Sequence, residues 1–126
     1  MITELKPSQI FVFGSNDLGS HGAGAAKLAF DKFGALWGVA RGPQGQSYAI
    51  ATLNVEMHPH LLIEIKLQIE QLYEVAIDNP HKEFLMTWIG CGIAGFKKSE
   101  IAPLLKGSPK NVILPEDYEQ VIQTKA

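Results

Sequence analysis

The sequence predicts one α/β domain, in which a mostly parallel central sheet is covered by helices on both faces as a three-layer sandwich. Short apolar runs rich in β-branched and aromatic residues alternate with helical segments, and these runs lack the polar alternation of a sheet with one exposed face. Strands that alternate with helices need crossover connections, which leave neighbouring strands parallel. The length suits a single domain, so residues 1–126 are expected to form one unit.

The first half of the chain begins with a clear strand. Residues 9–13, QIFVF, are mostly β-branched and aromatic without alternation, as in a central parallel strand. A helix is expected from about Gly22 to Phe33, because Gly34 is a good C-terminal cap. The remaining segments are a weaker strand or loop over residues 34–42, a turn marked by Gly42, Pro43 and Gly45, and a strand over residues 46–54.

The second half contains the most regular helical pattern of the sequence. Apolar residues recur at three- and four-residue steps at Leu62, Ile65, Ile69, Leu72 and Ala76. This period predicts a helix that starts after Pro59 and stops at Asn79-Pro80. The remaining elements are a buried strand over residues 83–90, a short helix from a Ser99 cap through Lys106 closed by Gly107, a strand over residues 111–115, and a last helix with Pro115 in its first position.

Composition and charge argue against several classes of protein. The formal net charge of −2 provides no global positive field, so general nucleic-acid binding is not expected. No apolar run reaches the roughly 18 residues of a membrane span, and the N-terminus lacks a basic signal-peptide region, which predicts a cytoplasmic protein. Cys91 is the only cysteine, so no intramolecular disulfide is expected. His58 and His60 lack a nearby third metal ligand, so a solvated loop is expected there and no metal site.

Two glycine-rich turns are the strongest functional signal. GSNDLGSHGAGAA follows the first strand and GCGIAGF follows the strand over residues 83–90. Ligands of open α/β sheets bind beyond the carboxyl ends of the strands, so these turns would face each other across one cleft if their strands are neighbours. Glycines let the backbone approach a phosphate, and successive N–H groups and a helix N-terminus attract its charge. The alternative is that the glycines serve only close packing of helix on sheet. The strict dinucleotide and P-loop patterns are absent.

The two turns together resemble a macrodomain, the module that binds ADP-ribose. IFVFGSNDLGSHGAGAAKLAFDKFG is similar to the macrodomain block in which a strand ends in asparagine before a glycine-rich loop and a helix. FLMTWIGCGIAGFKKSEIAPLL is similar to its second signature, a strand that enters a phosphate loop of the form I-G-x-G-I-x-G. Within this family, the sequence most resembles the branch that contains the terminal ADP-ribose protein glycohydrolase. It also resembles small macro-like bacterial or phage proteins. The resemblance covers most of residues 9–115.

This resemblance implies binding of ADP-ribose or a related nucleotide or diphosphate, with an ADP-ribosylated macromolecule as a possible partner and no cofactor. Asn16 would contact the distal ribose. The implied ligand-binding residues are Gly14, Ser15, Asn16, Gly22, Ala23, Gly24, Gly90, Cys91, Gly92, Ile93, Ala94, Gly95 and Phe96. Leu53 and Ala94 stand near the positions of the lysine and aspartate that form the covalent intermediate in the glycohydrolase branch. That mechanism is therefore expected to be absent.

A hydrolase that removes ADP-ribose, or a phosphate from its derivative, in the same cleft is the alternative interpretation. Its candidate catalytic residues are Asn16, Asp17 and His21, where the imidazole could act as a base and the carboxylate could orient a hydroxyl or a water. Two of them also have structural interpretations: Asp17 would satisfy local backbone groups in the turn, and His21 would be a polar surface residue or a hydrogen-bond donor. Cys91 is either a nucleophile near oriented amides or a small buried filler.

Overall fold

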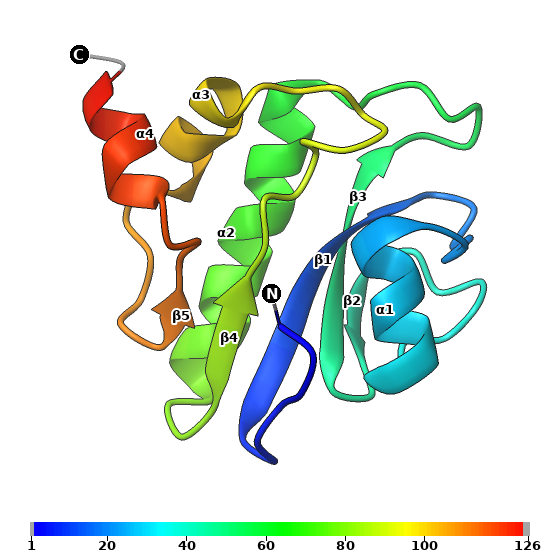
Figure 1. Ribbon diagram of the computed structural model, residues 1–126, viewed down its shortest axis with the longest axis horizontal. Helices are drawn as coiled ribbons and strands as arrows, with labels where there is room; N and C mark the ends of the chain where they lie inside the picture. The colour runs from blue at the N-terminus through cyan, green and yellow to red at the C-terminus, as the bar shows by residue number, and fades with distance from the viewer. Residues whose placement is uncertain (1, 125–126) are drawn as a thin grey trace.

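The protein has an α/β fold with a five-stranded, mixed and mostly parallel sheet (Figure 1). The computed structural model describes residues 2–124. The elements in chain order are β1 (Gln9–Asn16), α1 (Gly24–Lys32), β2 (Gly42–Gln44), β3 (Ser47–Leu53), α2 (Leu62–Asp78), β4 (Glu83–Met86), α3 (Lys98–Ile101), the 3₁₀ turn η1 (Ala102–Leu105), β5 (Val112–Ile113) and α4 (Tyr118–Thr124). The strand order is β2-β3-β1-β4-β5, and only the β2–β3 pair is antiparallel. The predicted α/β class is confirmed.

Strand β1 lies in the centre of the sheet, and both of its neighbours are parallel to it. Its register places Phe13 opposite Ala49 of β3 and Val12 opposite Met86 of β4. Ile10 and Val12 join one hydrophobic core, and Phe11 and Phe13 join another. The strand therefore buries side chains on both faces, which explains the continuous apolar run that identified it.

Helices lie on both faces of the sheet (Figure 1). The larger core packs α2, η1 and α4 against one face, with Ile65, Ile69 and Leu72 of α2 fully buried. The smaller core packs α1 against Phe11 and Phe13 on the other face, where the N-terminal Ile2 and Leu5 also contact it. No helix within residues 2–124 is long and apolar enough to cross a membrane.

Several element boundaries differ from the sequence predictions. The expected turn at residues 42–45 contains the short strand β2, because the glycine at Gly45 (φ +58°) folds it back onto β3. Strand β4 ends at Met86 rather than residue 90. Both the backbone N–H and the Oγ1 of Thr87 donate to the carbonyl of Val12, at 3.3 and 2.8 Å, and the chain then turns into the second loop.

Helix starts also differ from the predictions. Helix α1 begins at Gly24 and α4 at Tyr118, two and three residues later than expected. Ser99 lies within α3 and does not cap it, because the helix begins at Lys98 with Lys97 as its N-cap residue; Glu100 Oε1 accepts the N–H of Lys97 at 2.9 Å. The predicted last helix extends to residues 125–126, which lie outside the described residues.

Candidate functional site

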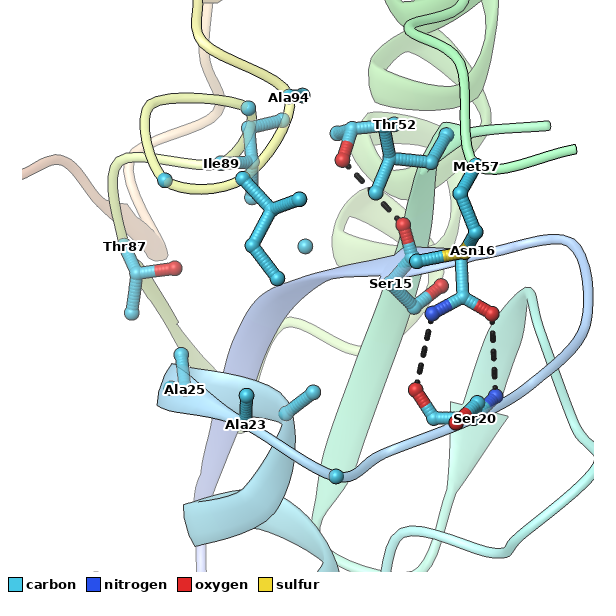
Figure 2. A pocket seen from close by; sticks show the side chains of 18 of the residues that line it. Ser15, Asn16, Ser20, Ala23, Ala25, Thr52, Met57, Thr87, Ile89 and Ala94 are labelled. Atoms are coloured by element: carbon cyan, nitrogen blue, oxygen red, sulfur yellow. Dashed lines mark hydrogen bonds between the residues drawn. The ribbon is translucent and has the colours of Figure 1, made fainter.

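The two glycine-rich loops line one cavity, at the carboxyl ends of β1, β3 and β4. Its volume is about 360 Å³. The lining residues are 14–16, 20 and 22–26 from β1, the first loop and the start of α1, then Thr52, Leu53 and Met57 from β3 and the loop after it, and 87–90 and 92–94 from the second loop (Figure 2). The site arises because β1 lies between β3 and β4, which brings their following loops to one edge of the sheet.

Close packing, together with a positive φ at two of them, accounts for three glycines near the site. A Cβ on Gly14 would lie 3.4 Å from the N atom of Gly90, so the end of β1 is in contact with the second loop. A Cβ on Gly90, whose φ is +76°, would lie 3.2 Å from a ring carbon of Phe96. A Cβ on Gly19 would lie 2.4 Å from the backbone of Gly38. The packing interpretation of the glycines therefore holds at these three positions.

Gly92 is different, because neither packing nor conformation requires a glycine there. Its φ is not in the positive range, and a Cβ built on it would meet nothing within 4 Å. It lines the cavity, as does Gly24, whose Cβ would also point into open space although its φ is +59°. At these two positions the lack of a side chain leaves space free in the cavity and is not needed for packing of the protein core.

Backbone N–H groups are the free hydrogen-bond donors of the cavity wall. Helix α1 begins without a side-chain cap, and its N-cap residue Ala23 is extended. Within the described chain, the N–H groups of residues 22–26 and of residues 92–94 have no hydrogen-bond acceptor. Unpaired N–H groups at a helix start carry a partial positive charge and attract anions. Two such sets, one from each loop, border the same space.

Asn16 closes the first loop on itself (Figure 2). Its Nδ2 donates to the carbonyl of Ser20 at 2.9 Å, and its Oδ1 accepts the N–H of Ser20 at 3.1 Å. Ser15 Oγ donates to the carbonyl of Ala40, and Thr52 Oγ1 donates to the carbonyl of Ser15 at 3.3 Å. These polar side chains in the wall are engaged by the protein, so they shape the cavity and leave the backbone donors exposed to it.

The structure brings most of the sequence-predicted ligand-binding residues together. Ten of the thirteen line the cavity: Gly14, Ser15, Asn16, Gly22, Ala23, Gly24, Gly90, Gly92, Ile93 and Ala94. Cys91, Gly95 and Phe96 are outside its lining. Phe96 packs against the larger core below Gly90. Burial raises the pKa of the Cys91 thiol; Lys98 opposes this shift, and the carboxylates of Glu100 and Asp117 add to it.

His21 and Asp17, proposed from the sequence as catalytic groups beside Asn16, are not among the lining residues. His21 is fully buried, with its ring centroid 5.4 Å from that of Phe13 and 6.2 Å from that of Trp37. Neither of its ring nitrogens has a hydrogen-bond partner within the described part of the chain. None of the residues described as lining the cavity has a titratable side chain.

Asp17 belongs to an ion-pair cluster that the sequence did not reveal. Its carboxylate is 3.0 Å from Arg41 Nε and 2.6 Å from His60 Nε2, and His60 Nδ1 is 2.7 Å from Glu64 Oε2. Burial favours a higher pKa for Asp17, but hydrogen bonds from Arg41 and His60 outweigh it and lower the pKa. His60 lies in the loop before α2, as expected, but its ring is half-buried and paired rather than solvated. Its spacing of four residues from Glu64 was a usable signal.

A second, mostly apolar cavity of about 700 Å³ adjoins the first. Gly24, Ala25, Thr87 and Trp88 line both. Trp88 is held in place from the far side, because its Nε1 donates to Asp117 at 2.7 Å. Lys98 Nζ donates to the same carboxylate at 2.6 Å and lies 5.5 Å from the centre of the indole ring. The two cavities therefore adjoin at Trp88.

Comparisons with known proteins found no match for this chain among protein-family models, curated proteins or solved structures.

Proposed function

We propose that the protein binds ADP-ribose or a related nucleotide diphosphate in the cavity between its two glycine-rich loops, on a three-layer scaffold of the macrodomain type. One observation carries the proposal: two sets of unpartnered backbone N–H groups, from residues 22–26 and 92–94, border one cavity. Main-chain donors and a helix N-terminus hold a diphosphate without cationic side chains. The resemblance of the two loop sequences to macrodomain blocks supports the same ligand.

The shape of the two adjoining cavities supports a ligand with a diphosphate and one larger apolar-faced group. The first cavity is too small for a complete nucleotide sugar, but it adjoins the second at Trp88. An aromatic base fits the apolar second cavity, where Asp117 is a carboxylate acceptor at the rim. The diphosphate would then lie between the two loops, and its other substituent would lie toward Asn16.

Binding is favoured over hydrolysis. A hydrolase needs a group in the cavity that moves a proton or attacks the substrate. The described lining contains no carboxylate, imidazole, thiol or amine, so its serine and threonine hydroxyls have no base in the cavity to activate them as nucleophiles. Leu53 and Ala94 are among the lining residues. We therefore propose a module that recognises the ligand or sequesters it without turnover.

Calorimetry with ADP-ribose, ADP and NAD tests the proposal. Gly92→Leu places a side chain in the cavity at a position where the backbone tolerates one, so the fold should persist while ADP-ribose affinity falls at least about tenfold, or ~1.4 kcal/mol. Gln71→Leu adds the same side chain at an exposed position of α2 and is the matched control. It should bind as the wild type does.

Two results would contradict the proposal. The first is the absence of heat with all three ligands at concentrations up to about 1 mM. The second is a Gly92→Leu variant that binds as tightly as the Gln71→Leu control, which would place the ligand elsewhere. Release of ADP-ribose from an ADP-ribosylated protein by the wild type would favour the hydrolase instead.

A further inference from the structure

We propose that Met57 closes the end of the cavity beside Asn16 and selects a ligand whose diphosphate ends in an uncharged sugar rather than in another phosphate. This inference rests on the proposed function and names the group that the ligand carries beyond its diphosphate. It starts from a backbone feature that the fold does not require.

Met57 has an unfavourable backbone conformation. Its φ is +62°, and it is the only non-glycine residue with positive φ in the part of the chain that the structure describes. It ends a tight turn in which its N–H donates to the carbonyl of Asn54 at 2.9 Å and Asn54 Oδ1 accepts the N–H groups of Glu56 and His58. Glycine or asparagine is the ordinary residue at such a position, because a Cβ is strained there.

Core packing does not explain the side chain at this position. Met57 is 39% exposed and belongs to neither hydrophobic core. Its side chain lines the cavity, in which Figure 2 draws it on the side of Asn16 and Ser20, away from Thr87. Strained residues concentrate at functional sites, where the side chain has a role that the backbone conformation alone lacks. Contact with a ligand is such a role.

The surroundings of Met57 define the chemistry of that end of the cavity. Leu53 also lines the cavity, and no cationic side chain is among the described lining residues. A phosphate placed beside Met57 would lose hydration against a thioether surface without a counter-charge. A sugar presents a C–H face to such a side chain and hydroxyls to polar groups such as the hydroxyl of Ser20, which also lines the cavity. The free backbone donors belong to other parts of the wall, residues 22–26 and 92–94, between which the diphosphate would lie.

The loop that carries Met57 is held at its base. The N–H of His60 donates to the carbonyl of Thr52 at 2.9 Å, and Leu53 pairs with Pro59 across the turn. The ring of His60 is fixed between Asp17 and Glu64. Met57 is therefore presented by a supported turn rather than by a free loop, as selection by shape requires.

The test compares ADP, ADP-ribose and ATP by calorimetry on the full chain, because these probes end in no further group, a sugar and a phosphate. We expect Met57→Gly to weaken ADP-ribose binding about five- to tenfold and to leave ADP binding within about twofold. Its melting temperature should stay level or rise by up to about 4 °C, since glycine relieves the backbone strain. Met57→Leu keeps an apolar side chain and should bind ADP-ribose within about twofold of the wild type. Met57→Lys should strengthen ATP binding at least about fivefold.

The outcomes separate this inference from the proposed function. If the wild type binds none of the probes, the proposed function fails and this inference fails with it. If the wild type binds ADP-ribose but Met57→Gly binds it equally well, only the inference is overturned. A Met57→Gly protein that melts below the wild type overturns it too, because Met57 would then be a residue that stabilises the fold. A wild type that prefers ATP to ADP-ribose also contradicts it.

Discussion

Replacing Gln68 by leucine should destabilise the protein by about 1–4 kcal/mol, because this buried side chain completes the edge of the sheet. Strand β2 pairs with β3 only as far as Ala49, which lies opposite Gly42. Two residues further along β3, Gln68 Oε1 accepts the N–H of Ala51 and Gln68 Nε2 donates to its carbonyl, both at 2.8 Å. The side-chain amide of Gln68 thus makes the two hydrogen bonds to Ala51 that a longer β2 would otherwise make, next to the cavity residue Thr52.

The size of this destabilisation follows from two backbone groups that lose their hydrogen-bond partner. Leucine has a similar size to glutamine and leaves the N–H and the carbonyl of Ala51 buried without partners. Each unsatisfied group costs about 1–3 kcal/mol, so the loss is about 2–6 kcal/mol. Gln68 is only 5% exposed, and the added apolar burial of leucine returns about 1–2 kcal/mol. The net destabilisation is therefore about 1–4 kcal/mol.

Urea denaturation measures this loss. With a slope of about 2 kcal/mol per molar urea, the midpoint should fall by about 0.5–2 M while the slope stays unchanged. Gln71→Leu makes the same substitution at an exposed position three residues further along α2, and its free energy of unfolding should change by less than about 0.5 kcal/mol. Equal midpoints for Gln68→Leu and Gln71→Leu would refute the reasoning.

Two further predictions concern titratable groups outside the cavity. The lowered pKa of Asp17 means that its ionised form stabilises the fold above the ordinary value of 3.8 and that this contribution is lost as pH falls through the folded-state pKa. The free energy of unfolding of Asp17→Asn should therefore be about 1–2 kcal/mol lower than that of the wild type at pH 7. The melting temperature of this variant should fall less steeply than that of the wild type below about pH 4. Equally steep falls would contradict this prediction. Since burial raises the pKa of Cys91, its thiol should react with iodoacetamide at pH 7.5 several-fold more slowly than glutathione, and an equal or faster rate would point to an activated thiol.

Local sequence patterns predicted the elements whose buried apolar residues recur at helical spacing or form an unbroken run. The apolar period at Ile65, Ile69 and Leu72 predicted α2, and the unbroken apolar run at residues 9–13 predicted a central strand. The order of strands and helices predicted a mostly parallel sheet, which in turn predicted that loops at the carboxyl ends of its strands would meet. The spacing of apolar residues and the order of the elements are properties of the sequence itself, so they can be recognised without a structure.

The sequence by itself thus determined the α/β class, the central strand and the two loops that line the cavity. Only the tertiary structure decided that Gly14 and Gly90 serve packing while Gly92 borders open space, since the glycines are identical in sequence and differ only in what surrounds them. It also decided that His60 meets Asp17, 43 residues away, and that His21 turns into the core rather than into the cavity. The physical reason is that contacts between distant segments depend on how the sheet and its helices pack, which no local pattern records.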